Sequence, residues 1–290
     1  MTSDTLIVFR THLWDEGVDF CARCLQRSTS ARIVVAADET NGPVPVPAEF
    51  EKIAHTVDTF PAMGLPLLPT RKNALWHCGD YPFYQIAQKV KSEYYLMIEG
   101  DLGITGPLDS LLKKMIADKV DCASCHFRSE ERWQNRRGAV SRRVFFPDDD
   151  PTAQVMTGLY AAVFLSRRII ETMLSERQRM AKVAAGPFGW YHCEEFTPIV
   201  AQKAKGNLAS FDTYADTSHV SWLRPIAPDT VTELEDDTVH ISHPVLFSPK
   251  WEKKQIQYLE HENDTLLKSV QRLRKRRAEL EKELELSRKG

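Results

Sequence analysis

The sequence lacks the features that would place it in several large classes of protein. No run of about 18 apolar residues occurs, so we expect no transmembrane segment. The apolar run at residues 6–9 is too short for a secretory signal and instead predicts a strand. The net charge is only −2, and the acidic excess lies in residues 1–249, which argues against general binding of nucleic acid.

Charge divides the chain into two parts. Residues 250–290 hold 12 Lys or Arg and 8 Asp or Glu, whereas residues 1–249 hold 26 and 32. A chain of 290 residues suits one large α/β domain with an appendage. We therefore expect a main domain over residues 1–249 and a separate element over residues 250–290.

Zinc-binding turns are also missing, although the chain has six cysteines. Cys21/Cys24 and Cys122/Cys125 both have the C-x-x-C spacing that can indicate zinc. The first pair lies in a predicted helix and the second in a predicted strand, where residues three apart face opposite sides. Neither pair sits in a Gly- or Pro-rich turn, so we predict buried free thiols.

The most informative stretch is residues 94–101, Tyr-Tyr-Leu-Met-Ile-Glu-Gly-Asp. Its continuous apolar run predicts a strand buried on both faces, in the middle of a mostly parallel sheet. Glu99 and Asp101 follow at the carboxyl end of this strand, where open α/β sheets bind ligands. Two such carboxylates can hold a divalent cation, and Gly100 would let the backbone approach a ligand. The alternative is an ordinary acidic turn.

Other short apolar runs and amphipathic segments predict the rest of an α/β fold. Strands are predicted at residues 5–10, 31–37, 52–57, 120–127, 157–166 and 208–212, and helices at 13–26, 82–90, 107–118 and 167–181. Asp80 is a plausible N-cap for the helix near Pro82. Glu194 and Glu195 precede a helix expected to follow Pro198. One of them can take a proton from an attacking hydroxyl, or both can simply complement the helix dipole.

This order of parts resembles that of GT-A nucleotide-sugar glycosyltransferases. The family's usual motif is Asp-x-Asp, so Glu99 in Glu99-Gly100-Asp101 is a departure from it. The resemblance covers residues 5–249 and implies a Rossmann-like, mostly parallel sheet flanked by helices. It also implies an enzyme that needs Mn²⁺ or Mg²⁺. Asp101 would bridge the cation to the donor pyrophosphate, and Glu99 would assist through the ribose or a metal-bound water.

The resemblance implies roles for residues beyond the central strand. GT-A enzymes often take one more metal ligand, commonly a histidine, from the C-terminal part of the domain. On a strand, His240 and His243 would point to opposite faces, so at most one can serve, and we favour His243. A core or surface histidine is the alternative. For the base in a single displacement with inversion we favour Glu195, with Glu194 as the fallback.

The resemblance also implies the partners. Asp38 would contact the base or ribose of the nucleotide, or else is a solvated strand end, and Lys72 and Asn73 would contact the donor. Because no anchor is recognised, the resembled enzyme is of a cytoplasmic, bacterial type. Its acceptor would be a glycan or glycolipid in lipopolysaccharide or capsule synthesis.

Two other classes of function remain open at this point. A nucleotidyltransferase would share the sheet and the metal carboxylates, but usually begins with a Gly-rich basic loop, which Arg10–Leu13 is not. A non-catalytic scaffold would recruit partners through its C-terminal segment. In that case Glu99, Asp101 and Glu195 need not converge in space.

Residues 251–289 contain no Pro or Gly and carry a heptad pattern. Its a positions are Ile256, Asn263, Val270, Arg277 and Leu284, and its d positions are Leu259, Leu266, Leu273 and Leu280. Leu at d with β-branched residues at a favours a parallel dimer, and one Asn at a fixes its register. We predict a coiled-coil homodimer; the alternative is an amphipathic helix folded against the main domain. The basic run at residues 272–277 would be solvated or approach anionic lipid.

Overall fold

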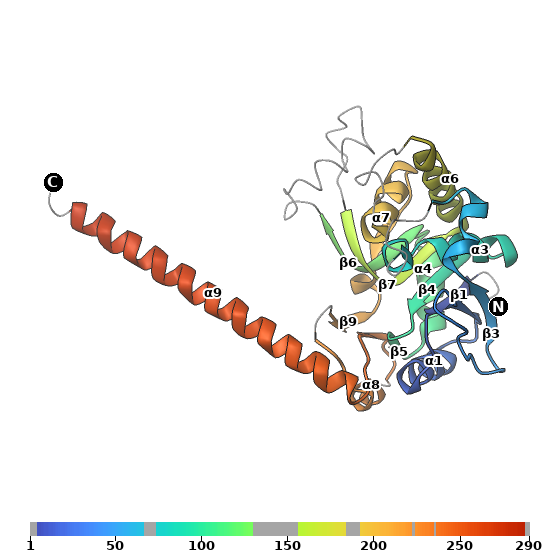
Figure 1. Ribbon diagram of the computed structural model, residues 1–290, viewed down its shortest axis with the longest axis horizontal. Helices are drawn as coiled ribbons and strands as arrows, with labels where there is room; N and C mark the ends of the chain where they lie inside the picture. Colours follow the sequence, from blue (N-terminus) through green and yellow to red (C-terminus); the bar gives the residue numbers. More distant parts are fainter. Residues whose placement is uncertain are drawn as a thin grey trace.

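A seven-stranded sheet forms the centre of the computed structural model, which describes residues 5–66, 74–129, 156–183, 192–221, 224–234 and 236–287. In spatial order its strands are β3 (Glu51–His55), β2 (Arg32–Asp38), β1 (Thr5–Thr11), β4 (Tyr94–Glu99), β7 (Met156–Ser166), β6 (Cys122–Ser129) and β8 (Leu208–Ser210). The first four run parallel, β7 is antiparallel to β4 and β6, and β8 is parallel to β6. The mostly parallel, Rossmann-like sheet with β4 at its centre is therefore confirmed (Figure 1).

Helices cover both faces of this sheet (Figure 1). In chain order the described helices are α1 (Glu16–Ser28), α2 (Ala74–His77), α3 (Tyr81–Lys89), α4 (Leu108–Ala117), α6 (Arg167–Val183), α7 (Cys193–Lys203), α8 (Pro228–Glu233) and α9 (Lys250–Ser287). Side chains of α3, α6 and α7 share one hydrophobic core, and those of α1 and α4 share the other.

Strand β1 shows why the sequence of the sheet is continuously apolar. Leu6 and Val8 belong to the core beneath α3, α6 and α7, whereas Ile7 and Phe9 belong to the core beneath α1 and α4. Successive side chains of a strand point to opposite faces. Because both faces are covered, the four residues 6–9 are all apolar and do not alternate with polar residues; the polar residues of β1 lie at its two ends.

A second, smaller sheet brings the C-terminal part of the main domain to the end of β4. Its order is β5 (Gly103–Thr105), β10 (His240–His243) and β9 (Asp216–Val220). β10 is antiparallel to β5, which follows Asp101 in the chain. The N–H of Val245, just after β10, donates a 2.7 Å hydrogen bond to the carbonyl of Asp101. This pairing places His243 beside the carboxylates that end β4.

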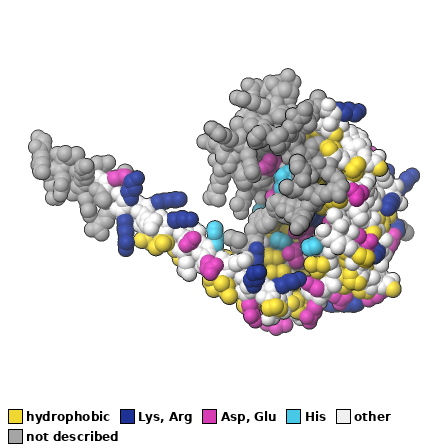
Figure 2. All heavy atoms as spheres, in the orientation of Figure 1, with side chains coloured by type: hydrophobic (Ala, Val, Ile, Leu, Met, Phe, Trp, Pro, Cys, Tyr) yellow, Lys and Arg dark blue, Asp and Glu magenta, His cyan; other side chains and the backbone are white. Residues whose placement is uncertain are grey.

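The last helix, α9, projects from the main body (Figure 1). At its start Lys250 pairs with Asp15, the N-cap residue of α1, at 2.5 Å. Its apolar side chains lie at the surface among charged ones (Figure 2). The expected alternative of a helix folded against the main domain is therefore wrong. Among the described helices, none combines the length and apolar character that a membrane span needs.

Two local expectations differ from the structure. Asp80 makes no side-chain hydrogen bond to the start of α3; its carboxylate is instead buried against Arg177. Helix α7 begins at Cys193, so Glu194 and Glu195 lie in its first turn and Pro198 lies inside it. The predicted free thiols are confirmed, because all six cysteines are buried and unpaired by disulfides.

Candidate active site

The ends of β1 and β4 form one edge of the candidate site. Because the two strands are parallel neighbours, Arg10 lies directly beside Glu99, and their side chains form an ion pair. A Cβ atom on the next residue, Gly100, would lie 2.9 Å from Oγ1 of Thr11 in β1. Glycine is therefore required here for packing against β1. From the sequence we expected Gly100 to let the backbone approach a ligand and did not anticipate this packing.

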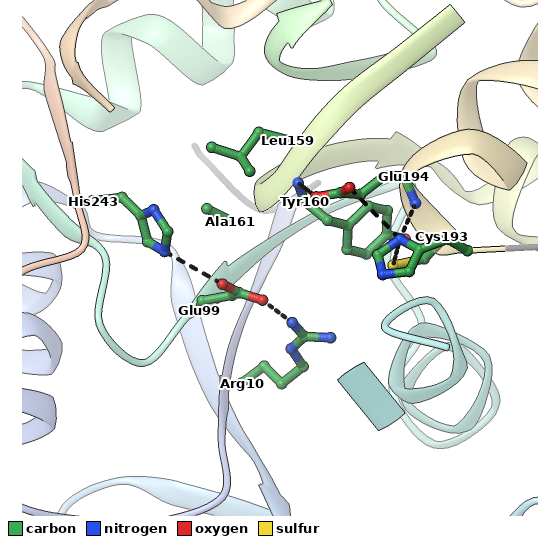
Figure 3. A pocket seen from close by; sticks show the side chains of 9 residues that line it. Arg10, Glu99, Leu159, Tyr160, Ala161, Cys193, Glu194 and His243 are labelled. Atoms are coloured by element: carbon green, nitrogen blue, oxygen red, sulfur yellow. Dashed lines mark hydrogen bonds and ion pairs between the residues drawn. The ribbon is translucent and has the colours of Figure 1, made fainter. Parts of the chain in front are cut away.

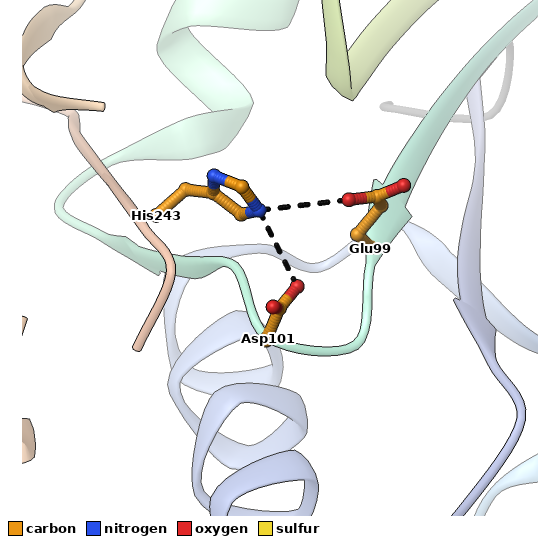
Figure 4. Close-up of side chains that lie close together, drawn as sticks. All are labelled: Glu99, Asp101 and His243. Atoms are coloured by element: carbon orange, nitrogen blue, oxygen red, sulfur yellow. Dashed lines mark ion pairs between the residues drawn. The ribbon is translucent and has the colours of Figure 1, made fainter. Parts of the chain in front are cut away.

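His243 joins the two carboxylates from the second sheet (Figure 4). Its Nε2 lies 3.5 Å from Oε2 of Glu99 and 3.5 Å from Oδ1 of Asp101. Its Nδ1 lies 3.1 Å from the carbonyl oxygen of Ser221, to which it donates. This second contact orients the ring and leaves Nε2 directed at the carboxylates. One ligand atom from each of the three residues lies within 4.8 Å of the others.

The electrostatics of this cluster suit a divalent cation. Burial alone would lower the pKa of His243, but Asp101 and then Glu99 raise it to about 10. Burial would likewise raise the pKa of Asp101, whereas contact with His243 lowers it. A proton on Nε2 therefore balances the carboxylates when no cation is bound, and a cation would displace it. Carboxylate oxygens with an oriented imidazole are a donor set that fits the cation implied by the resemblance.

A pocket lies beside the cluster, and a third carboxylate stands across it (Figure 3). The pocket is lined by Arg10, Glu99, Leu159, Tyr160, Ala161, His192, Cys193, Glu194 and His243. Glu194 comes from the first turn of α7, and its Oε1 accepts a 3.4 Å hydrogen bond from the N–H of Tyr160. Burial raises the pKa of Glu194 to about 7. A carboxylate with this pKa can accept a proton near neutral pH.

His192 holds the first turn of α7 in place. Its Nδ1 accepts a 3.3 Å hydrogen bond from the N–H of Glu194, and its ring packs edge-on against His77 with centroids 4.9 Å apart. Burial lowers the pKa of His192 to about 4, so the ring is neutral near pH 7 and Nδ1 can act as an acceptor. The ring thus caps the helix that carries Glu194.

The structure does not bring Asp38 or Glu195 into the wall of the pocket. Asp38 ends β2 at the same edge of the sheet, but its carboxylate accepts hydrogen bonds from the N–H and hydroxyl of Thr40. Neither Asp38 nor Glu195 is among the described residues that line the pocket. Lys72 and Asn73 lie outside the described residues.

The two histidines of β10 have separate surroundings. His240 lies 3.1 Å from Asp216 and 3.0 Å from Asp236, whereas His243 faces the carboxylates that end β4. Of these two histidines, His243 alone belongs to the possible metal group with Glu99 and Asp101. This agrees with the expectation that side chains three residues apart on a strand point to opposite faces.

Sequence reasoning missed Arg10, Tyr160, His192 and Cys193 as pocket residues. Arg10 had a usable signal, because it lies near the end of a predicted strand that could pair with the central one. The other three had none, since they depend on how β7 and α7 pack against each other.

Comparisons with known proteins give similarities of architecture. No protein-family profile matches the chain, and no curated protein sequence matches it. Mouse xyloside xylosyltransferase 1 is similar over 82% of this chain and 97% of its own, with 11% identity and a TM-score of 0.44. A mannosyltransferase from Pyrobaculum calidifontis, in complex with GDP-Man and Mn²⁺, is similar over 88% and 61%, with 10% identity and a TM-score of 0.41. A CMP:2-keto-3-deoxy-manno-octonic acid synthetase with CTP is similar over 72% and 89%, with 14% identity and a TM-score of 0.39.

Proposed function

We propose that this chain is a metal-dependent glycosyltransferase, which moves a sugar from a nucleotide-sugar donor to a hydroxyl group of an acceptor. The observation that carries the proposal is the convergence of Glu99, Asp101 and His243 at the carboxyl edge of the parallel strands. Open α/β sheets bind nucleotides at this edge. Glu194 stands on the other side of the same pocket, so a metal-bound diphosphate and a base can meet there.

One set of residues would bind the cation that stabilises the leaving group, and a separate residue would activate the nucleophile. A bound cation would neutralise the negative charge that develops on the departing nucleoside diphosphate. Asp101 and Glu99 would hold that cation through carboxylate oxygens, and His243 would hold it through Nε2. The carbonyl of Ser221 keeps the ring of His243 in the required orientation.

Glu194 is our first candidate for the base, with Glu195 as the alternative. Glu194 lines the pocket, and its pKa of about 7 leaves it about half ionised at neutral pH. A base with a pKa near the working pH is the most effective proton acceptor. Taking the proton of the acceptor hydroxyl on this side, opposite the leaving group, supports a single in-line displacement with inversion.

A donor-binding experiment tests the proposal. Calorimetric titration of the full chain with UDP-, GDP- and CMP-linked sugars should give heat of binding for at least one donor, and only with Mn²⁺ or Mg²⁺. Asp101→Asn should weaken this binding by at least about 10-fold, since it removes a metal ligand. Asp216→Asn is the matched control, because Asp216 pairs with His240 away from the pocket.

Two results would contradict the proposed glycosyltransferase function. One is wild-type donor affinity that survives both Asp101→Asn and chelation of the metal. The other is release of pyrophosphate from a nucleoside triphosphate without sugar transfer, which would identify a nucleotidyltransferase.

The assembly proposed for this enzyme is a parallel homodimer formed through α9. Ile256, Leu259, Leu266 and Val270 occupy a and d positions, and their exposed fractions are 42% to 63%. Association of two copies removes this apolar stripe from water. A parallel pair in register also places Asn263 of one copy opposite Asn263 of the other, where the two amides can bond.

The acceptor and location complete the proposal. We place the enzyme in the cytoplasm, where it would add sugar to a glycan or glycolipid of surface-glycan synthesis, of the lipopolysaccharide or capsule type. The basic run at residues 272–277 supports peripheral contact with anionic lipid at the inner membrane face. Co-sedimentation with anionic vesicles at low salt, and its loss with neutral vesicles, is the expected result. Equal recovery with both kinds of vesicle would remove the membrane contact from the proposal.

A further inference from the structure

A largely buried arginine lies beside the cation site and lines the same pocket as the candidate base. The side chain of Arg10 is 14% exposed, and its guanidinium forms part of the pocket wall (Figure 3). Nη2 of Arg10 donates to Oε1 of Glu99, while Oε2 of the same carboxylate faces His243 at 3.5 Å. Gly79 makes room for this arrangement, because a Cβ atom there would lie 2.4 Å from Nη1 of Arg10.

One carboxylate, Glu99, is therefore shared between Arg10 and the cation site. A divalent cation held at Oε2 would draw the negative charge of the carboxylate towards itself. It would also bring positive charge close to the guanidinium. Both effects weaken the attraction between Arg10 and Glu99. Cation binding would then leave Arg10 in need of another anion.

The chemistry of the guanidinium indicates which anion this is. Arginine carries five N–H donors in a planar fork, which matches the oxygens of a phosphate group. Its charge persists at any pH that the protein meets, so it cannot simply become neutral when Glu99 is taken by a cation. The pocket that it faces is the one in which the proposed donor would place its diphosphate.

We propose that Arg10 is a diphosphate-binding residue that Glu99 masks until the cation binds. The inference rests on the proposed function, because it takes the nucleoside diphosphate part of the donor as the ligand. Without a cation, Glu99 neutralises Arg10. With a cation on Glu99, the guanidinium turns its N–H donors to the phosphate oxygens. Cation and diphosphate therefore each raise the affinity for the other.

Binding measurements on Arg10 variants distinguish direct binding of diphosphate by Arg10 from a role in which Arg10 only positions Glu99. The protein is titrated with UDP, GDP and CDP, with and without Mn²⁺, and its affinity for Mn²⁺ alone is measured by paramagnetic resonance. Arg10→Met should weaken diphosphate binding in the presence of Mn²⁺ by about 10- to 100-fold, the effect of a lost charge-assisted hydrogen bond. Its affinity for Mn²⁺ alone should stay the same or increase. Arg10→Lys, which keeps the charge without the fork, should be intermediate. Arg32→Met is the control, because it removes an exposed ion pair with Glu51 at the start of β2.

The variant Glu99→Gln should change the affinity for nucleoside diphosphate in the opposite direction, from a loss to a gain. This change removes the mask, so the affinity for nucleoside diphosphate without Mn²⁺ should rise by about 10-fold, while the affinity for Mn²⁺ falls. Combining it with Arg10→Met should abolish the gain. Circular dichroism verifies that each variant is folded. If Arg10→Met does not fold, Arg10→Lys and Glu99→Gln still decide the question.

Three results would overturn the inference. The first is unchanged diphosphate affinity in the Arg10 variants. The second is a loss of Mn²⁺ affinity that accounts for the whole loss of diphosphate affinity, which would make Arg10 only a support for Glu99. The third is no gain in metal-free affinity for Glu99→Gln. Wild-type protein that binds no nucleoside diphosphate with Mn²⁺ would instead reject the proposed function, and this inference with it.

Discussion

An ion pair without solvent exposure connects three helices behind the candidate site. Asp80, just before α3, and Arg177 of α6 both have side chains that are 0% exposed. Nε and Nη2 of Arg177 donate to the two carboxylate oxygens at 2.8 and 2.9 Å. The guanidinium carbon lies 3.7 Å from the ring centroid of Phe196 in α7, the helix that carries Glu194. We predict that Asp80→Asn or Arg177→Met, each of which breaks this pair, strongly destabilises the fold.

The expected magnitude follows from the burial of both charges. Removing one partner leaves the other charge uncompensated in the core, which costs about 3–5 kcal/mol. For a domain of this size each kcal/mol lowers the melting temperature by about 2–4 °C, so we expect a fall of about 6–20 °C. The double variant Asp80→Asn/Arg177→Met removes both charges. It should recover part of the loss, because a neutral replacement of a buried pair leaves no orphaned charge.

Urea and thermal unfolding, followed by circular dichroism, measure these effects. The control is Arg179→Met on the same helix. It removes an arginine that is 52% exposed and leaves its partner Glu176 paired with Lys203, so it should cost less than about 1 kcal/mol. Single variants that cost no more than this control would refute the reasoning. A double variant that loses the full sum of the two singles would refute it as well, because the charges would then act independently.

The remaining predictions concern the base, the dependence of rate and stability on pH, and the assembly. Glu194→Gln should retain donor binding and lose about 10²–10⁴ in transfer rate, whereas Glu195→Gln should transfer almost normally; the reverse result assigns the base to Glu195. The wild-type rate should rise with pH through about 7, as Glu194 loses its proton. The stability of the cation-free protein should move the other way. The pKa of Glu194 is raised in the folded state, so the unfolded chain releases this proton at a lower pH. The free energy of unfolding should therefore fall as the pH rises from about 4.5 to 7. The Glu194→Gln variant should not show this fall. Light scattering should show a dimer for the full chain and a monomer for Leu266→Asp or for a chain truncated at Lys250. The control His261→Asp, at an f position outside the a/d seam, should remain dimeric. A monomeric full chain or a dimeric truncated chain would exclude dimerisation through α9.

The framework of the fold was predictable because its central strands, β1 and β4 among them, are buried on both faces. Such strands leave uninterrupted apolar runs, and the run at residues 94–98 forms most of the central strand β4. The carboxylates at its end were predictable for the same reason, since parallel strands place their carboxyl ends along one edge. The seven-stranded order itself was not predictable, because the pairing of β6 with β8 and β7 depends on contacts between distant segments.

The errors arose where a distant partner outweighed a local signal. Asp80 stands before a helix that begins Tyr81-Pro82, which is the local pattern of an N-cap. Its carboxylate instead meets Arg177, 97 positions later in the chain, in an ion pair that excludes water. Gly100 is a different case: it also packs closely against Thr11 in β1, a contact that the local sequence did not indicate. His243 was found through the family resemblance, because no local rule places β10 beside the end of β4.

The choice between Glu194 and Glu195 depends on helix register, which the sequence did not supply. Neighbouring residues of an α-helix point about 100° apart, so the start of the helix decides which carboxylate faces the pocket. With the helix placed after Pro198, both carboxylates would lie in a loop and either could turn inward. Because α7 begins at Cys193, that residue and Phe196 face the core, at 1% and 0% exposure. This register directs Glu194 to the N–H of Tyr160 on β7, at the wall of the pocket. Burial at that wall is also the main cause of its raised pKa, so the same packing both orients Glu194 and gives it the pKa that the proposed base requires.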